Sequence, residues 1–245
     1  MGEYRRSNVF AIGDLHLSFE SQKPMGIFGS EWNGHTESIE RNWRRIIGED
    51  DVVLVLGDIS WALKYSQARA DLEWISALPG RKLLFKGNHD LWWGGVGKLR
   101  EDYPLLAFIQ NDARRIGDTA FCGSRGWLCP GDPNYGLNDV KIYKRELIRL
   151  RMSLEKAKGT GAEEIIAGMH FPPMANNGLA TGFTDLMDEF GVKTVAFGHL
   201  HGRDAFKKAV TGRLGGSDYR LVSADYVGFR PQRIGEIMEV KEEEV

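Results

Sequence analysis

Short apolar runs that each end in a polar cluster constrain the fold of this chain more than any other feature. The runs are rich in Val, Ile, Leu and Phe, which is typical of buried strands. They cover residues 9–12, 52–56, 83–86, 165–167 and 194–197. Segments with helical periodicity lie between them, and this alternation predicts an α/β protein.

The longest helical pattern covers residues 138–158, where apolar side chains recur three or four positions apart and Gly159 follows. Shorter helical patterns cover residues 36–47 and 66–78. From Ala205 onward, short strands are expected at 219–224 and 234–240. No repeat or linker divides the sequence, so we expect a single domain over residues 1–245 with a frayed acidic end at 241–245.

Composition argues against several classes of function. The 32 basic and 34 acidic side chains nearly balance, which weakens a nuclease interpretation. Cys122 and Cys129 form no zinc or redox motif and are expected to be buried or incidental thiols. No apolar run approaches the ~20 residues of a membrane helix, and the charged segment 1–7 does not resemble a secretion signal, so a cytoplasmic protein is expected.

The polar clusters hold nearly all of the histidines. Of six histidines, five directly follow a predicted strand beside glycine, namely His16, His89, His170, His199 and His201. Structural histidines have no reason to gather at strand ends, whereas ligands of a shared site must converge there. Imidazole, carboxylate and one amide, without thiolate, favour divalent Mn, Fe, Zn or Co, and two such ions can activate water for attack on a phosphate.

The order of these clusters resembles the calcineurin-like metallophosphoesterase superfamily. Its pattern of Asp-x-His, Gly-Asp, Gly-Asn-His-Asp/Glu, a His after a strand, and Gly-His-x-His occurs in full between residues 14 and 201. The resemblance implies a four-layer α/β/β/α sandwich in which two mixed β-sheets are flanked by helices. It also implies two metal ions, with Mn favoured, and hydrolysis by a hydroxide that bridges them.

The same resemblance implies a role for each matching residue. One metal is expected to be held by Asp14, His16, Asp58 and His201. The other is expected to be held by Asp58, Asn88, His170 and His199, so that Asp58 bridges the two. His89 is expected to stabilise or protonate the leaving oxygen without binding metal, and Asp90 to orient the His89 ring.

One departure from the family concerns the residues after Asp58. Many members continue Gly-Asp-x-x-Asp, but here Trp61 stands at the position of the second Asp. Because that Asp is a supporting residue in relatives, its loss bears on the surroundings of the ligands more than on the metal site.

Aromatic and basic residues near the blocks are candidates for the substrate pocket. Trp61, Trp92 and Trp93 follow metal blocks closely, and Trp92 is the preferred pocket residue. Arg125, between glycines and near Trp127, is a candidate phosphate clamp. The glycine-rich loop 26–34, with Trp32 and the adjacent His35, is a candidate lid. Asn176 and Asn177 are expected to be turn residues.

The leading hypothesis is therefore a metal-dependent phosphatase or phosphodiesterase that acts on a small phosphorylated substrate. The alternatives are a metal-binding scaffold of the same fold without turnover, and a nuclease. The sequence does not separate monoesters from diesters, and it gives no oligomeric state.

Overall fold

The computed structural model describes residues 4–21, 23–175 and 178–240. The predictions for Asn176, Asn177 and the segment 241–245 lie outside these ranges. Across the described residues, no helix combines the length and apolarity needed to cross a bilayer.

The first sheet has the order β11-β1-β2-β3-β4. Its strands are β1 (Tyr4–Ile12), β2 (Val52–Leu56), β3 (Arg81–Phe85), β4 (Leu106–Ile109) and β11 (Gln232–Val240). The strands β1 to β4 are parallel, and β11 pairs antiparallel with β1. Parallel pairing places the carboxyl ends of β1, β2 and β3 at one edge of this sheet.

The second sheet has the order β5-β6-β7-β8-β10-β9. Its strands are β5 (Arg114–Ile116), β6 (Thr119–Ser124), β7 (Glu164–Met169), β8 (Thr194–Phe197), β9 (Gly212–Leu214) and β10 (Ser217–Leu221). The central strands are parallel, and β5 and β9 pair antiparallel at the two edges. A bridge between Gly13 and Ser223 joins the chain after β1 to the chain after β10.

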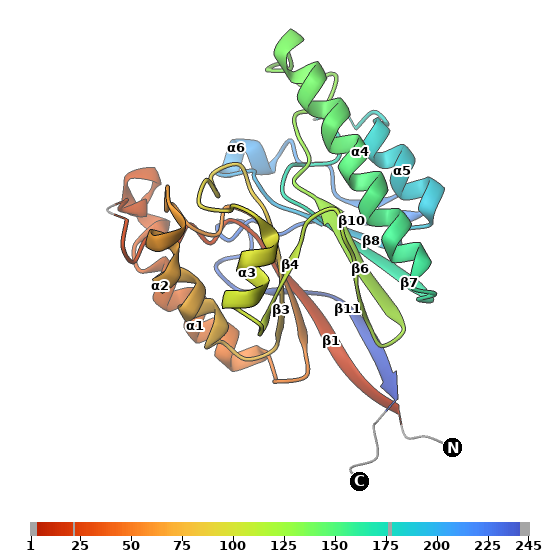
Figure 1. Cartoon of the computed structure of the whole chain (residues 1–245). Helices are drawn as coiled ribbons and strands as arrows, with labels where there is room; N and C mark the ends of the chain where they lie inside the picture. The colour runs from red at the N-terminus through yellow and green to blue at the C-terminus, as the bar shows by residue number, and fades with distance from the viewer. Residues whose placement is uncertain (1–3, 22, 176–177, 241–245) are drawn as a thin grey trace.

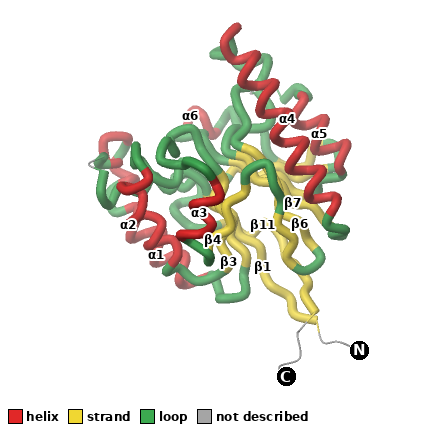
Figure 2. The backbone as a smooth tube through the Cα atoms, in the orientation of Figure 1, coloured by secondary structure: helices red, strands yellow, loops and turns green. Residues whose placement is uncertain are grey.

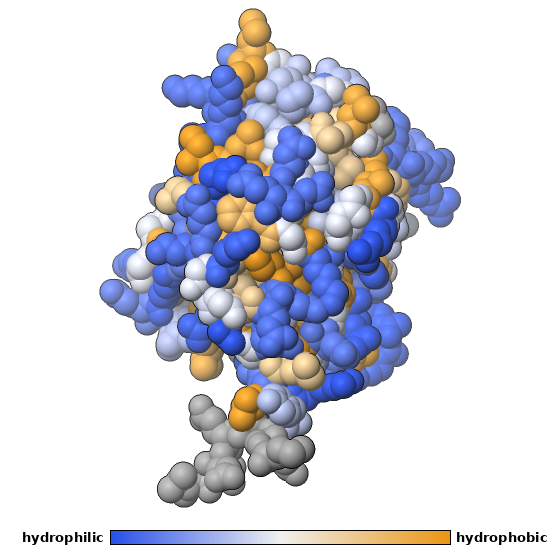
Figure 3. Space-filling view, turned by 90° about the vertical axis from the view of Figure 1, so that its right-hand side faces the viewer, coloured by the Kyte–Doolittle hydropathy of each residue, from blue (hydrophilic) through white to orange (hydrophobic). Residues whose placement is uncertain are grey.

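Helices cover the outer face of each sheet (Figures 1 and 2). On one side lie α1 (His35–Ile46), α2 (Tyr65–Ser76) and α3 (Val96–Asp102); on the other lie α4 (Leu137–Gly159) and α5 (Gly182–Phe190). The short elements η1 (Met25–Phe28), η2 (Ser30–Trp32) and α6 (Arg203–Phe206) belong to the loops. The side that carries α4 and α5 is mainly hydrophilic with scattered hydrophobic patches (Figure 3).

Three hydrophobic layers hold this arrangement together. Phe10 and Ile12 pack toward α1 and α2, whereas Val9 and Ala11 pack toward the second sheet. A third layer lies between the second sheet and α4 and α5. Because the central strands are buried on both faces, their sequences read as continuous apolar runs rather than as an alternation. The predicted four-layer sandwich is confirmed.

Candidate metal centre

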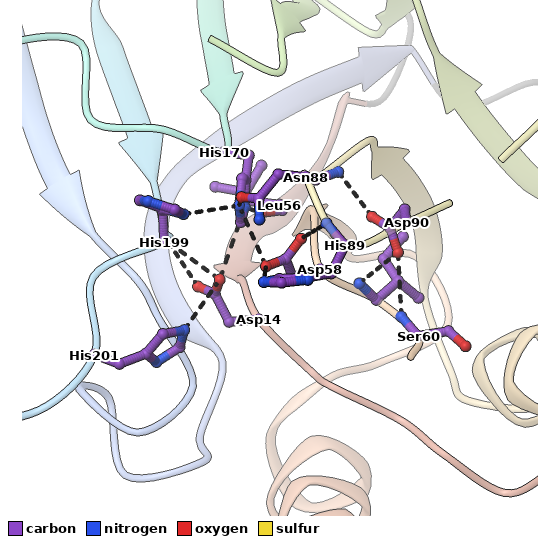
Figure 4. A network of polar contacts seen from close by, with 12 residues as sticks. Asp14, Leu56, Asp58, Ser60, Asn88, His89, Asp90, His170, His199 and His201 are labelled. Carbon is purple, nitrogen blue, oxygen red and sulfur yellow. Dashed lines mark hydrogen bonds and ion pairs between the residues drawn. The ribbon is translucent and has the colours of Figure 1, made fainter. Parts of the chain in front are cut away.

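Side chains that could bind metal converge from both sheets at the strand ends (Figure 4). One group consists of Asp14, His16 and His201, and the other consists of Asp58, His170 and His199. Within each group, one ligand atom from each residue lies within 4.8 Å of the others. The loops that follow β1, β2, β7 and β8 supply these six side chains, as the strand-end argument predicts.

Asn88 joins the second group from the loop after β3. Its Oδ1 lies 2.8 Å from Nε2 of His170, which in turn lies 3.2 Å from Nδ1 of His199. The structure therefore brings together all seven residues that the sequence suggested as ligands.

The ring of His170 shows why this cluster suits a cation. Its Nδ1 lies 3.0 Å from the carbonyl oxygen of Leu56, which can only accept a hydrogen bond. The neutral ring then carries its proton on Nδ1, so Nε2 presents a lone pair to the oxygen of Asn88. Two acceptors that face each other repel unless a cation lies between them. Metal–ligand bonds of about 2.0–2.2 Å bring neighbouring ligand atoms to roughly 3 Å from each other, which is close to the distance between Nε2 of His170 and Oδ1 of Asn88.

Four of the seven residues have a backbone conformation that is uncommon for residues other than glycine. The φ angles of Asp14, His16, Asp58 and His199 are 59°, 47°, 46° and 72°. Such left-handed residues cost of order 1–3 kcal/mol each and concentrate at functional sites. Here the conformation turns each side chain into the shared space at the end of its strand.

Two glycines allow the ligand loops to approach closely. A Cβ on Gly198 would lie 2.4 Å from Oδ2 of Asp14, and one on Gly87 would lie 2.1 Å from the backbone nitrogen of Asp58. Any side chain at either position would displace a ligand, which gives the glycines of these motifs a packing role.

The electrostatics of the cluster also fit bound cations. Burial and the nearby charge of Asp14 raise the pKa of Asp58 to about 7. Burial would raise the pKa of Asp14 as well, but His201, His170 and His16 hold it below its usual range. Burial and the neighbouring His170 lower the pKa of His199 to about 3, so this imidazole is neutral and free to bind metal. Nδ1 of His16 is buried and has no hydrogen-bond partner among the described residues. An atom that binds a metal ion would need no such partner.

His89 lies beside the ligands but belongs to neither group. Its side chain is 46% exposed, and its Nε2 lies 4.0 Å from Oδ2 of Asp58. Its backbone nitrogen donates to Oδ1 of Asp58 over 2.8 Å, which fixes the loop and leaves the ring facing outward.

The expected role of Asp90 is corrected by the structure. The Asp90 carboxylate is fully buried and accepts hydrogen bonds from the backbone of Ile59, Ser60 and Gly87 and from the indole of Trp92. Among the contacts of the described residues, none joins it to the His89 ring. Asp90 therefore ties the loop after β2 to the loop after β3, because four donors occupy its oxygens.

The arrangement of these residues agrees with a sequence comparison. Residues 7–203 match the family described as calcineurin-like phosphoesterase. The chain belongs to the calcineurin-like phosphoesterase family.

Individual proteins and solved structures are similar to this chain to different degrees. The chain is 37% identical over 201 residues to the Gene 66 protein of Mycobacterium phage D29, covering 80% of each chain. It is 37% identical over 84 residues to the Gene 66 protein of Mycobacterium phage L5, covering 34% of this chain and 40% of that protein. A purple acid phosphatase from yellow lupin seeds shows a TM-score of 0.46 at 12% identity, covering 98% of this chain and 48% of that one. A protein of unknown function from Aquifex aeolicus shows a TM-score of 0.45 at 17% identity, covering 92% and 94%.

Two carboxylates outside the family motif support the candidate ligands or the loops that carry them, and sequence reasoning missed both. Asp225 lies 2.9 Å from Nδ1 of His201 and accepts the backbone N–H of Gly202. Asp71 is fully buried and accepts hydrogen bonds from the hydroxyl of Ser60 and the backbone of Phe19. Asp71 lies within the predicted helix 66–78, where a carboxylate reads as a solvated side chain. Asp225 directly follows the predicted strand 219–224, and that position at a strand end is the signal that could have marked it.

A cavity of about 360 Å³ opens beside the ligands of this family member. Its lining includes the candidate ligands His16, Asp58, His199 and His201, the neighbouring His89, and the loop residues Met25, Phe28, Glu31, Trp32, Trp61, Gly202 and Asp225. The glycine-rich loop 26–34 thus forms one wall of the cavity; whether it moves as a lid stays a prediction.

The expected pocket role of Trp92 is wrong. Trp92 is only 2% exposed, and its indole nitrogen donates to buried Asp90, so the ring lies in the core between the first sheet and its helices. Trp61, three residues after Asp58, lines the cavity instead.

Arg125 also lies away from the cavity lining. Its guanidinium forms an ion pair with Glu146 over 3.3 Å and stacks over Trp127 at 4.5 Å. Its part as a phosphate clamp stays a prediction. Cys122 and Cys129 are buried free thiols, as expected.

Proposed function

We propose that this protein is a dinuclear metal-dependent phosphoesterase that hydrolyses phosphomonoesters or phosphodiesters of small molecules. The observation that carries the proposal is the convergence of two adjacent three-residue ligand groups, joined by Asn88, on the ends of strands from both sheets. A site that only stabilised the fold would need one ion and no cavity beside it.

The seven side chains divide between two ions in this proposal. Asp14, His16 and His201 would hold one ion, Asn88, His170 and His199 would hold the other, and Asp58 would contribute to both. When bound, the ions supply a water that deprotonates near neutral pH and positive charge opposite the phosphate. The oxygen and imidazole-nitrogen donor set suits divalent Mn, Fe, Zn or Co, and Mn²⁺ is the metal we propose among these.

His89 is the proposed proton donor to the leaving oxygen. Its ring lines the cavity next to Asp58, outside both ligand groups, and its Nε2 is close enough to Asp58 for attraction when the ring is protonated. A positioned acid of this kind contributes typically 10²–10⁴-fold to the rate.

The test compares wild type with His89→Ala and Asn88→Ala. Bound metal is measured after purification, and hydrolysis of p-nitrophenyl phosphate, bis(p-nitrophenyl) phosphate and ethyl phosphate is followed with added Mn²⁺. We expect about two ions per chain in wild type and in His89→Ala. The rate of His89→Ala on ethyl phosphate, whose leaving alkoxide needs a proton, is expected to fall by about 10²-fold or more, with a smaller loss on the p-nitrophenyl esters, whose phenolate leaves without one. Asn88→Ala is expected to lose metal as well as activity.

Other outcomes overturn the proposal. Two bound ions without hydrolysis of either ester would indicate a metal-binding scaffold. Equal rates in all three proteins would assign the activity to a contaminant.

A further inference from the structure

The cavity beside the metal centre extends beyond the space that a phosphate group would fill. It runs from the ligands His16 and His199 to the loop residues Met25 and Phe28. Its volume of about 360 Å³ lies within the range of small-molecule sites, so it can take a further part of the substrate.

The outer part of the cavity has apolar, largely aromatic walls. Phe28 and Trp61 have nearly parallel rings, with centroids 6.4 Å apart and planes 7° apart. The Trp61 indole nitrogen donates to the sulfur of Met25 over 3.0 Å, which fixes the tryptophan against the loop. Trp32 closes another side and packs edge-on against His16 and His201. Aromatic walls of this kind favour flat apolar groups.

The position of His89 decides which part of an ester would lie there. The rings of Trp61 and His89 are 4.5 Å apart, so the aromatic wall begins next to the proposed proton donor. A donor to the leaving oxygen must lie on the side of the departing alcohol. The group between Phe28 and the metal centre is then the alcohol portion, not a second substituent of the phosphorus.

We infer that this cavity binds the alcohol portion of the ester and selects alcohols that carry a flat apolar group, such as an aromatic ring. The inference rests on the proposed phosphoesterase function and narrows its substrate class. Phe28 and Trp61 are the residues that set the preference.

The charges around the cavity agree with this selection. None of the described residues that line it is Lys or Arg, and the loop contributes the carboxylate of Glu31. A second phosphate on the alcohol would therefore meet no Lys or Arg side chain in the lining. Lys23 lies outside the lining with its ammonium 4.0 Å from the centre of the Trp61 ring. The Lys23 side chain is exposed, so it can move aside when a flat group stacks on the Trp61 ring.

The test compares three phosphate monoesters whose primary alcohols have similar acidity. These are 2-phenylethyl, 2-cyclohexylethyl and ethyl phosphate, measured with the Mn²⁺-loaded protein. We expect kcat/KM for the phenylethyl ester to exceed that of the ethyl ester by about tenfold or more, with the cyclohexyl ester between them. The mixed diester ethyl 2-phenylethyl phosphate offers both alcohols at once, and we expect release of 2-phenylethanol in excess over ethanol.

Phe28→Ala and Phe19→Ala are a matched pair of variants. Both phenylalanines are about half exposed, at 56% and 50%, so neither truncation opens the core, but only Phe28 lines the cavity. We expect Phe28→Ala to lower the phenylethyl-to-ethyl ratio about threefold or more, mainly through KM of the aromatic ester. Phe19→Ala is expected to keep the wild-type ratio.

The outcomes separate this inference from the function on which it rests. Failure to hydrolyse any ester, including the p-nitrophenyl compounds, would overturn the proposed function. Hydrolysis of ethyl and phenylethyl esters at equal kcat/KM would overturn the selection alone, as would a ratio that Phe28→Ala leaves unchanged.

Discussion

Trp61 stacks on His16, with ring centroids 4.7 Å apart and ring planes inclined by 17°. Trp61 occupies the position at which many members of the family carry a second aspartate after Gly-Asp. In this chain an indole therefore supports a proposed metal ligand from a position that holds a carboxylate in relatives. Asp71 supplies a buried carboxylate to the same loop from elsewhere in the sequence, through the hydroxyl of Ser60.

Replacement of Trp61 by Ala is expected to weaken metal binding. The His16 ring would lose the surface that fixes its orientation, and loss of such an outer contact typically costs about 10–100-fold in metal affinity or activity. Titration of the metal-free protein with Mn²⁺ measures the effect. Trp61→Phe keeps an aromatic face and is expected to retain most of the affinity. Equal affinities in wild type and Trp61→Ala would show that stacking does not position His16.

Asp225→Asn is expected to impair the site through His201. The Asp225 carboxylate holds both the ring and the backbone that follows it, and the amide would weaken both contacts. We expect about 10–100-fold lower metal affinity or activity, measured by Mn²⁺ titration and hydrolysis of p-nitrophenyl phosphate. The control is Asp204→Asn, since that carboxylate is 91% exposed and pairs with Lys207 on the surface. A defect of the same size in the control would contradict the role of Asp225.

Asp90→Asn is expected to lower stability as well as activity. The amide nitrogen of Asn would face a backbone N–H or the Trp92 indole, leaving a buried donor without an acceptor at a cost of about 1–3 kcal/mol. Urea unfolding of the metal-free protein measures the loss. His89→Ala, whose ring is half exposed, is expected to unfold as wild type does. If Asp90→Asn were as stable as wild type but hydrolysed esters more slowly, Asp90 would contribute to the reaction itself and not mainly to the stability of the loops.

Gly198→Ala is expected to displace Asp14 and lower metal content. The added Cβ would fall 2.4 Å from Oδ2 of Asp14, and the carboxylate has little room to retreat because it is buried. Elemental analysis of the purified protein checks this. Gly97→Ala serves as the control, since a Cβ there meets nothing within 4 Å. Full metal content in Gly198→Ala would show that the loops can adjust.

Mn²⁺ is expected to stabilise the fold, and chelation to destabilise it. Buried Asp14 and Asp58 repel each other in the metal-free protein, and a ligand at 100 times its Kd adds about 2.7 kcal/mol per site. Thermal unfolding with Mn²⁺ and with EDTA measures the difference. A smaller shift is expected in Asn88→Ala, and an unchanged Tm in wild type would contradict metal binding.

The apolar runs predicted seven of the strands and three of the helices, because strands buried on both faces carry a strong local pattern. The strands β4, β5, β6 and β9 and the helices α3, α5 and α6 were not predicted. Leu106–Ile109 has only four residues, and Thr119–Ser124 mixes apolar residues with Thr, Gly and Ser, so neither stands out as an apolar run. Each pairs with a predicted strand that fixes it in its sheet.

The sequence by itself determined the family, the sandwich and the seven side chains that meet at the strand ends, because each of those residues belongs to a compact motif that ends a buried strand. Only the tertiary structure decided which tryptophan faces the cavity, since Trp61 and Trp92 both follow a motif closely. Buried Asp90 draws the Trp92 indole inward, whereas the Trp61 ring is held between His16 and the loop at Met25. The support that Asp225 gives to His201 likewise depends on tertiary structure. The loop after β10 lies beside the loop after β8, and no local sequence pattern encodes the contact between these two loops.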